Sequence, residues 1–285
     1  MPDRVAVVTM PDRVAVVTGA TGGIGRFIAV GLARAGLHVV VVGRDAGRGA
    51  AALAFVRDQV AGASVELMLA DLSSMVETRA LGARIVAAHP AVSVLVNNAG
   101  VFRARRSETA EGHETVLAVN HLSPFVLTRA LVQALVPGAR VVTVGSDASE
   151  RAGIDPDNLE LKRGWNLWRA YSRSKLAVLM QMVEWSRRLQ AQGVTVNVVH
   201  PGFVATRIVR TPGVIGVAWK LLRLVGRTEE QGAETPLHVA LDAGLAGVTG
   251  AYFKDKAAVA PNRLALDRGL VGRVWTATER LVLLP

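Results

Sequence analysis

The chain has 285 residues, of which 51% are hydrophobic, and a mean hydropathy of +0.33, which excludes intrinsic disorder and supplies a large core. Cysteine is absent, which excludes disulfides and thiolate metal sites, and we expect a cytoplasmic protein with no metal. The net charge of +10 does not indicate nucleic-acid binding, because the basic residues are dispersed and their densest cluster, Arg103, Arg105 and Arg106, is short.

The first nine residues, MPDRVAVVT, are repeated at residues 10–18. A structural repeat would span a supersecondary unit of about 20 residues or more. We therefore interpret residues 1–9 as a duplicated start, with Met10 as the natural one, and predict a single domain over residues 10–285. Neither a signal peptide nor an apolar run of about 18 residues that could span a membrane is expected.

Short β-branched runs alternate with longer helical patterns along the chain. Strands are predicted at 13–18, 38–42, 65–69, 92–96, 140–144, 194–199 and 249–253. Helices are predicted at 24–35, 47–60, 75–88, 114–136 and 167–190. Such alternation, with nearly continuous valine runs in the strands, is typical of a parallel sheet buried on both faces. We predict an α/β fold: one doubly wound Rossmann-type domain whose seven-stranded parallel sheet has helices on both faces.

A glycine-rich turn follows the first strand and opens the first helix. Gly19 permits the tight exit from the strand, Gly23 lets the backbone approach a pyrophosphate, and Gly25 allows the helix to pack closely on the sheet. The helix N-terminus then offers free N–H groups to the phosphates. An ordinary glycine-rich loop is the alternative, but the strand–turn–helix context favours dinucleotide binding. The predicted contacts of this turn are Gly19, Thr21, Gly22, Gly23, Ile24 and Gly25.

The end of the second strand bears on the choice between NAD and NADP. Sites that prefer NAD usually carry an acidic residue there, which holds the ribose hydroxyls. Here Gly43 takes that place and Arg44 follows, and its guanidinium would pair with a 2′-phosphate. We therefore predict NADP(H) in preference to NAD(H). Against this, Asp45 could rotate inward, and Arg44 could be a solvated loop residue.

Tyr171 and Lys175 form a Y-x-x-x-K pattern on a predicted helix, and their spacing places both on one face. A free phenol has a pKa of about 10, and a nearby ammonium group lowers it. Tyr171 is then a candidate general acid for carbonyl reduction, or general base for alcohol oxidation, and Lys175 would also bind the nicotinamide ribose. Ser146, at the end of the fifth strand, would orient the substrate oxygen, with Ser149 as its competitor.

Together these motifs resemble the short-chain dehydrogenase/reductase family. T-G-x-x-x-G-x-G (18–25), Asp71-Leu72, N-N-A-G (97–100), Y-x-x-x-K and Pro201-Gly202 follow one another in the family's order, and the resemblance runs from Arg13 to about Pro261. It implies that Asp71 contacts the adenine, that Asn120 anchors a water in the proton relay, and that Thr206 binds the nicotinamide carboxamide. The further cofactor contacts that it implies are Leu72, Asn98, Ala99, Gly100, Pro201, Gly202 and Val204.

A long gap between Ser146 and Tyr171, followed by W-x-A-Y-x-x-S-K-L-A (168–177), resembles the retinol dehydrogenase-like branch of that family. Where that branch reads V-N-H-L-G-H-F, this chain has Ser123-Pro124 in place of G-H, and the proline alters the helix around Asn120. His121, in the same segment, is interpreted as a packed helix residue. The resemblance implies a small lipophilic alcohol, ketone or aldehyde as substrate.

The segment from Phe203 to Arg227 is interpreted first as an apolar lid, second as a packed amphipathic helix or dimer contact, and third as a peripheral membrane contact. Asn158, Trp165 and Trp168 would line the opposite wall. The function predicted is that of an NADP(H)-dependent oxidoreductase. A catalytically silent nucleotide-binding regulator and a nucleotide-sugar epimerase or dehydratase are the alternatives. A homodimer or homotetramer is expected, with the helices at 114–136 and 167–190 as candidate interfaces.

Overall fold

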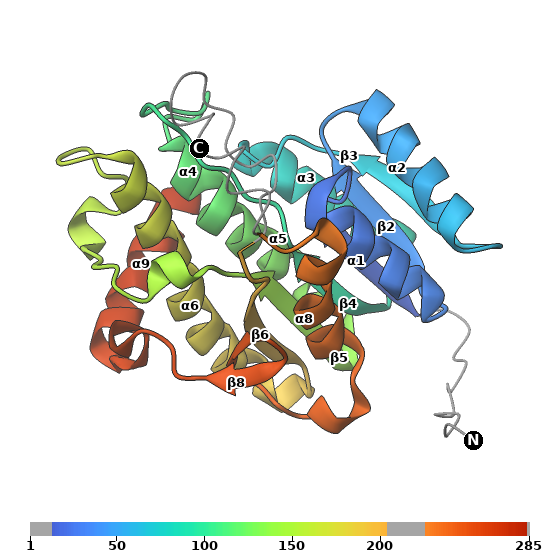
Figure 1. Ribbon diagram of the computed structural model, residues 1–285. Helices are drawn as coiled ribbons and strands as arrows, with labels where there is room; N and C mark the ends of the chain where they lie inside the picture. The colour runs from blue at the N-terminus through green and yellow to red at the C-terminus, as the bar shows by residue number, and fades with distance from the viewer. Residues whose placement is uncertain (1–12, 204–225, 284–285) are drawn as a thin grey trace.

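One sheet runs through the computed structural model, which describes residues 13–203 and 226–283 (Figure 1). Its strand order is β3-β2-β1-β4-β5-β6-β7-β8. The strands are β1 Val14–Thr18, β2 His38–Gly43, β3 Val65–Leu69, β4 Val92–Asn97, β5 Leu135–Val144, β6 Thr195–His200, β7 Tyr252–Lys254 and β8 Ala257–Val259. The predicted α/β fold and all seven predicted strands are confirmed in position.

The sheet has an eighth strand that the sequence analysis did not predict. Strands β1 to β7 pair in parallel, whereas β8 pairs antiparallel with β7 through a two-residue hairpin. Asp255 and Lys256 form its loop with φ of 53° and 65°. Two-residue hairpins usually place Asn-Gly or Asp-Gly at these positions, because both residues need positive φ. An Asp-Lys pair lacks that signature, which is why the hairpin was missed.

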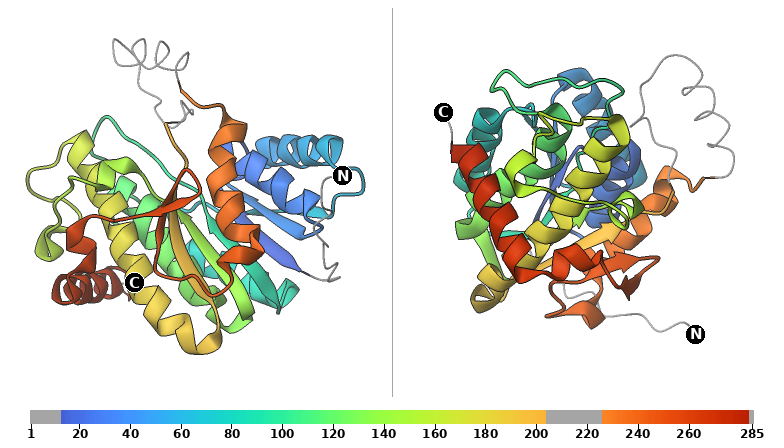
Figure 2. Two further views of the ribbon diagram at one scale, coloured as in Figure 1. Left: turned by 60° about the horizontal axis from the view of Figure 1, so that its bottom comes forward. Right: turned by 90° about the vertical axis from the view of Figure 1, so that its left-hand side faces the viewer.

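Helices lie on both faces of the sheet (Figure 2). Their bounds are α1 Gly23–Arg34, α2 Ala46–Gln59, α3 Met75–Ala88, α4 Thr115–Leu117, α5 Ser123–Leu131, α6 Leu167–Leu189, α8 Glu229–Leu241 and α9 Arg268–Leu283. One face packs against α1, α2 and α8, and the other against α3, α5, α6 and α9. Alternate strand residues face opposite sides, so that Val16 and Val17 of β1 enter different cores.

No bounds were predicted for helices α8 and α9, although the sequence carries an N-terminal capping signal for α8. Thr228 accepts from Gln231 N, and the Gln231 side chain accepts from Thr228 N, which is a capping box. Helix α9 packs through Trp275, whose ring lies 4.7 Å from Phe125 and 4.9 Å from Trp185. These contacts bring the C-terminal helix onto α5 and α6.

The helical run 115–134, predicted as one helix, contains a π-helical turn at Ala118–Leu122 between α4 and α5. Pro124 lies in the first turn of α5, directly after the π turn, so it offers no N–H to the carbonyl groups of that turn. Within the described residues, this run alone is long and apolar enough to cross a membrane, with a mean hydropathy of 1.3. However, 83% of its most apolar window is buried inside the protein, as expected of a core helix.

His121 lies in this π turn and is fully packed, as the sequence analysis interpreted it. Its Nε2 donates to Thr278 Oγ1 at 2.8 Å, and Gln181, with its amide nitrogen toward the ring, donates to Nδ1 at 3.1 Å. Both ring nitrogens are therefore satisfied by the neutral imidazole. Burial lowers the pKa of His121 to about 3, although the hydrogen bond to Gln181 acts in the opposite direction.

The depressed pKa of His121 makes the protein less stable in acid. The unfolded chain binds this proton near pH 6.5 and the folded chain only near pH 3, so stability is lost as the pH falls through that window. From this residue we expect a loss of about 2 kcal/mol between pH 7 and pH 5. Urea unfolding at both pH values should show a smaller loss in His121→Gln than in the wild type. Equal losses in the two proteins would contradict this assignment, and His238→Gln, at a partly exposed histidine of α8, serves as the control.

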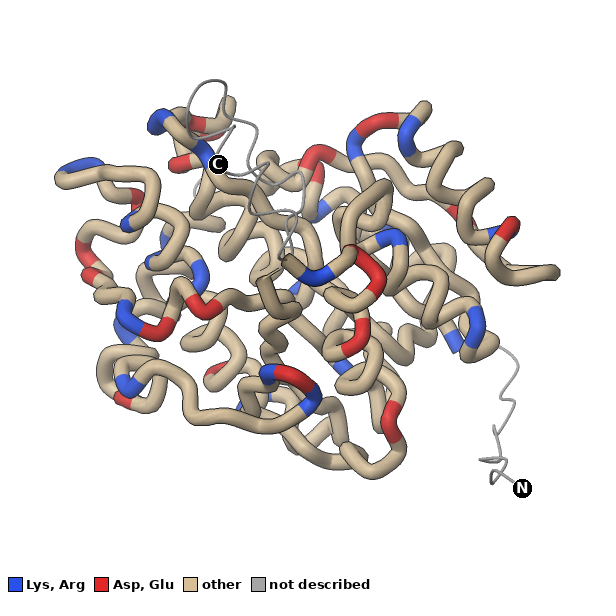
Figure 3. Tube along the Cα trace, in the orientation of Figure 1, with Lys and Arg blue, Asp and Glu red and all other residues tan. Residues whose placement is uncertain are grey.

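Lys and Arg residues are spread over helices and loops and interspersed with Asp and Glu (Figure 3). Along the described part of the Cα trace drawn there, the Lys and Arg positions form no continuous stripe of the kind that tracks a nucleic-acid backbone. The positive net charge therefore reflects many dispersed arginines.

Candidate active site

The glycine-rich turn lies at the carboxyl end of β1 and leads into α1. Gly19 and Gly23 have φ of 65° and 61°, a region that side-chain-bearing residues rarely adopt. A Cβ on Gly25 would meet the Asn98 amide and lie 2.6 Å from Gly19 O. A Cβ on Gly19 would lie 2.9 Å from Ala99 Cα. Gly19 and Gly25 therefore lie where the backbone packs too closely for a side chain, as predicted for a dinucleotide-binding turn.

The N-terminus of α1 is suited to an anion. Gly22 is the N-cap and provides no side-chain cap, and the first turn carries no acidic residue. The first N–H groups of a helix lack intrahelical acceptors and carry partial positive charge. Glycines that leave no room for a Cβ, together with an uncapped helix N-terminus, fit the pyrophosphate of a dinucleotide. Ile24 lies at the start of α1 with its side chain in the core.

Asn98 joins the neighbouring strand end to this turn. Its Nδ2 donates to Thr18 O at 2.8 Å, and its backbone N donates to Thr18 Oγ1 at 3.0 Å. Ala99 N also donates to Thr18 Oγ1, at 3.1 Å. The segment Asn97–Gly100 therefore braces the end of β4 against the end of β1, so that Asn98, Ala99 and Gly100 lie beside the glycine turn.

Arg44 follows β2 at the same edge and is exposed. Asp45 is committed elsewhere: it caps α2, and its carboxylate accepts from Arg48 N at 2.7 Å. A Cβ on Gly43 would run into the Thr21 methyl group, so position 43 has no room for the acidic side chain of an NAD-preferring site. Arg48, which the sequence analysis missed, places Nη2 3.6 Å from the Cβ position of Gly22.

Asp71 and Leu72 follow β3. Asp71 Oδ1 accepts from Ser73 N at 2.9 Å and from Ser73 Oγ at 2.8 Å, and Ser74, not Asp71, caps α3. Oδ1 of Asp71 is thus engaged locally, in an Asx-type turn. The Leu72 side chain lies in the core, which leaves its backbone as the part that a cofactor could contact.

Tyr171, Lys175 and Ser146 meet at the carboxyl edge of the sheet. Tyr171 and Lys175 lie one turn apart on α6, and the Tyr171 hydroxyl is hydrogen-bonded to Ser146. Lys175 Nζ donates to Val144 O at 2.7 Å and lies 5.8 Å from the centre of the Tyr171 ring. Ser149 is excluded as the competing serine, because it is fully buried and its hydroxyl donates to Ser146 O.

The electrostatics of this pair differ from the expectation. Burial raises the pKa of Tyr171, and the hydrogen bond to Ser146 only partly offsets that rise. Burial also lowers the pKa of Lys175 to about 8. The expected lowering of the tyrosine pKa by the lysine is absent from this arrangement, because the ammonium group is bonded to a backbone carbonyl instead of facing the hydroxyl.

Asn120 lies within the π turn and is buried. Its side chain pairs with the Val101 backbone, accepting from N at 2.8 Å and donating to O at 3.1 Å. It also donates to Ser174 Oγ at 3.0 Å, which links it to the helix that carries Tyr171 and Lys175. Single π turns inside helices are frequent at functional sites. Asn120 is thus adjacent to the tyrosine and lysine despite Pro124.

Pro201 and Gly202 follow β6, and Gly202 has φ of 82°. Phe203 and Arg227 are joined by a backbone hydrogen bond, in which Arg227 N donates to Phe203 O at 2.9 Å. Val204 and Thr206, and residues 204–225 of the proposed lid, lie outside the described residues. The position of Pro201 and Gly202 is at the same edge as Ser146.

Aromatic side chains lie next to Tyr171. The Phe102 ring lies 5.2 Å from Tyr171 and 5.2 Å from Trp168, edge to face in both cases. Trp168 is 63% exposed, so this apolar surface is open to solvent. Trp168 was a candidate from the sequence, whereas Phe102 was missed although it lies two residues after the Asn97–Gly100 segment, because that motif was interpreted only for the cofactor. Val101, held by Asn120, is what positions it.

Two other candidates for the substrate wall have structural roles. Trp165 packs in a small core with Tyr171 and donates from Nε1 to Glu114 at 3.3 Å. Asn158 bonds to the Arg163 backbone and lines a surface groove of about 840 Å³ beside α9. The placement of Asn158 on the substrate wall was therefore wrong.

Comparison with known proteins agrees with this geometry. A family model described as short chain dehydrogenase matches residues 13–212. Polyprenol dehydrogenase of Mus musculus is 38% identical over 290 residues, covering 98% of this chain and 84% of that protein. Retinol dehydrogenase 12 of Homo sapiens is 35% identical over 284 residues, covering 99% and 87%.

A solved structure adds a nucleotide complex. A short chain dehydrogenase from Burkholderia cenocepacia J2315 in complex with NADP superposes with a TM-score of 0.69 at 27% identity, covering 85% of this chain and 96% of that one. The fold, the family model and the relatives agree. This chain therefore belongs to the short chain dehydrogenase family of oxidoreductases, and its relatives include retinol dehydrogenases.

Proposed function

We propose that this chain is an NADP(H)-dependent oxidoreductase that interconverts a lipophilic alcohol and the corresponding aldehyde or ketone, with Tyr171 as general acid and base. The observation that carries the proposal is the Tyr171 hydroxyl bonded to Ser146, with the buried Lys175 one helical turn away. These groups lie at the edge where the glycine turn and the Asn97–Gly100 segment also end.

Each residue of this set has a defined task. The nicotinamide group, when bound, supplies or accepts the hydride. In carbonyl reduction, the Tyr171 hydroxyl donates its proton to the substrate oxygen and Ser146 donates a hydrogen bond to the same atom. Lys175, with its pKa of about 8, is mostly protonated at pH 7, and its ammonium group would hold the nicotinamide ribose. Asn120 holds Val101 and Ser174 in place around them.

The preference for NADP(H) rests on the end of β2. Arg44 and Arg48 offer two guanidinium groups, Asp45 is occupied as a helix cap, and Gly43 has no room for a carboxylate. Guanidinium groups pair with phosphate in a bidentate manner. The NADP complex of the Burkholderia relative supports the same choice.

The experiment is a fluorescence titration with NADPH and NADH on the wild type and on Arg44→Ala. We expect tighter binding of NADPH, and a rise of about tenfold in its Kd in the variant, which is about 1.4 kcal/mol. NADH binding should not change, because NADH has no 2′-phosphate. Arg187→Ala, an exposed arginine on α6, is the matched control. Equal affinities for the two cofactors in the wild type would contradict the proposal.

The lipophilic substrate is supported by the surface next to Tyr171. Phe102 and Trp168 form an apolar wall there, and Phe203 is 48% exposed at the end of β6. The relatives named for polyprenol and retinol are named for lipophilic alcohols. Contiguous exposed apolar surface often marks a ligand-binding site, so a substrate with an extended apolar part suits this wall.

A further inference from the structure

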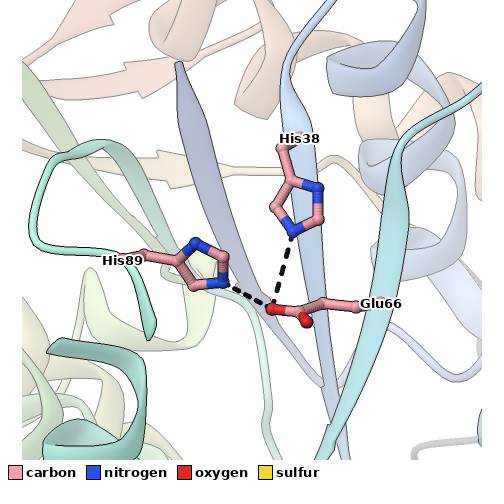
Figure 4. A group of neighbouring side chains, drawn as sticks. All are labelled: His38, Glu66 and His89. Carbon is pink, nitrogen blue, oxygen red and sulfur yellow. Dashed lines mark hydrogen bonds and ion pairs between the residues drawn. The ribbon is translucent and has the colours of Figure 1, made fainter. Parts of the chain in front are cut away.

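Three metal-ligating side chains gather at the amino ends of β2 and β3. The candidate active site lies at the opposite, carboxyl ends of the strands. His38, Glu66 and His89 point toward one another (Figure 4). His89 Nε2 lies 2.5 Å from Glu66 Oε1, and His38 Nε2 lies 3.5 Å from the same oxygen. One ligand atom from each residue fits within 4.8 Å of the other two. No other such group occurs in residues 13–203 and 226–283.

Strand register brings the three residues together. Val40 pairs with Glu66, so their side chains share one face of the sheet, and His38 shares it as well because it lies two residues before Val40. Val40 packs in the same core as Ile85 of α3, and His89 is the C-cap of that helix. Two neighbouring strands and one helix end thus converge at this corner, where β3 is the edge strand.

His89 makes a short hydrogen bond to Glu66, whereas the contact between His38 and Glu66 is 1 Å longer, at 3.5 Å. The His38 Nδ1 atom is engaged by Ser64 Oγ at 2.7 Å, which fixes the ring orientation. Its Nε2 atom then faces Glu66 Oε1 at 3.5 Å, a longer contact than that of His89, and is shielded from solvent. A second hydrogen bond on the far nitrogen is the usual device that orients a histidine for metal binding. A metal ion would replace this long contact by a direct bond to the His38 Nε2 atom.

We propose that His38, Glu66 and His89 bind one Zn²⁺ ion, with solvent in the fourth position. Two imidazole nitrogens and one carboxylate oxygen are a set that Zn²⁺ favours, whereas Mg²⁺ and Ca²⁺ favour oxygen alone. Bonds of about 2.0–2.1 Å in a tetrahedral site place ligand atoms about 3.3 Å apart. The separation of 3.5 Å between His38 and Glu66 already matches, and the separation of 2.5 Å between His89 and Glu66 would have to widen by about 0.8 Å.

The three side chains are partly exposed, by 26%, 37% and 16% for His38, Glu66 and His89, although the His38 Nε2 atom itself is covered. The site lies at the amino ends of the strands, whereas the glycine turn and Ser146 follow the carboxyl ends of β1 and β5. The ion would therefore act as a clip that joins β2, β3 and α3, and it would not take part in catalysis. The sequence analysis expected no metal, because without cysteine only the fold shows that these distant residues meet.

Calorimetric titration of the untagged protein with ZnCl₂ tests the proposal. We expect one ion per chain, a higher Tm with Zn²⁺ than with EDTA, and no binding of MgCl₂ under the same conditions. His38→Gln and Glu66→Gln should each weaken Zn²⁺ binding at least tenfold. His238→Gln is the matched control, because His238 also faces a carboxylate, that of Asp242 at 3.0 Å, but has no second histidine.

Two further measurements separate Zn²⁺ binding from the folding of the variants and from cofactor binding. The Co²⁺ form of the wild type should show the intense visible absorption of a tetrahedral site, which needs no variant. The NADPH Kd should be the same with Zn²⁺ and with EDTA, so the metal site and the proposed function succeed or fail separately. Absence of Zn²⁺ binding by the wild type, or equal binding by the wild type and both folded variants, would overturn the proposal.

Discussion

Replacement of Tyr171 by phenylalanine is expected to lower kcat for carbonyl reduction by about 10²–10⁴-fold, the usual contribution of a positioned acid or base. Phenylalanine keeps the ring that packs against Phe102 and removes only the hydroxyl that is bonded to Ser146. The Kd for NADPH should therefore stay unchanged. Steady-state kinetics with a reactive aldehyde, together with a cofactor titration, measure both quantities.

The second tyrosine of the chain supplies the control. Tyr252 is buried in β7, and its hydroxyl lies 3.5 Å from Asp147 Oδ1. We expect Tyr252→Phe to keep most of the activity. If Tyr171→Phe retained the wild-type kcat, or if both variants lost activity to the same extent, the role of Tyr171 as acid and base would be wrong.

Replacement of Gly25 by alanine is expected to disrupt cofactor binding and stability together. The new methyl group would overlap the Asn98 amide and lie 2.6 Å from Gly19 O and 3.0 Å from Ala20 Cα, so backbone must move. Overpacking of this kind costs about 1–3 kcal/mol of unfolding free energy. A displaced turn no longer presents its N–H groups correctly, so the Kd for NADPH should rise at least about tenfold.

Thermal unfolding and the same NADPH titration measure this effect. We expect Tm to fall by roughly 2–4 °C for each kcal/mol lost. Gly272→Ala is the matched control, because Gly272 lies in α9 and a Cβ there meets nothing within 4 Å. A Gly25→Ala protein with wild-type Tm and NADPH affinity would show that the close approach of α1 to β4 is not needed.

The strands and the main site residues could be predicted from local sequence patterns. Valine runs marked the seven parallel strands, and the glycine turn, Tyr171 and Lys175 carry chemistry in their spacing. The structure places Asn98 against Thr18 and Ser146 against Tyr171. For these positions, strand order and the rule that ligand sites lie at the carboxyl ends of strands were sufficient.

What the sequence could not predict depends on three-dimensional proximity. The π turn at Ala118–Leu122 was not predicted as such, although Pro124 marked this segment as an altered helix. Phe102 becomes a neighbour of Tyr171 because Asn120 holds Val101. Lys175 was expected to lower the pKa of Tyr171, yet its ammonium group donates to Val144 O. Burial instead raises the pKa of Tyr171 and lowers the pKa of Lys175.

One side-chain contact, made by Asp45, bears on the predicted preference for NADP(H). Asp45 appeared in the sequence as a residue that could turn inward and repel a 2′-phosphate. In the structure its carboxylate accepts from Arg48 N and caps α2. That contact removes the observation that opposed NADP(H) and adds Arg48 as a second candidate cation.

The most direct test of the proposed activity is the rate of NADPH oxidation by the wild type with a series of straight-chain aldehydes of increasing length. We predict measurable turnover with kcat/KM that rises with chain length, as each additional CH₂ reaches the surface formed by Phe102 and Trp168. The absence of NADPH oxidation with every member of the series, or a kcat/KM that is independent of chain length, would contradict the proposed oxidoreductase with a lipophilic substrate.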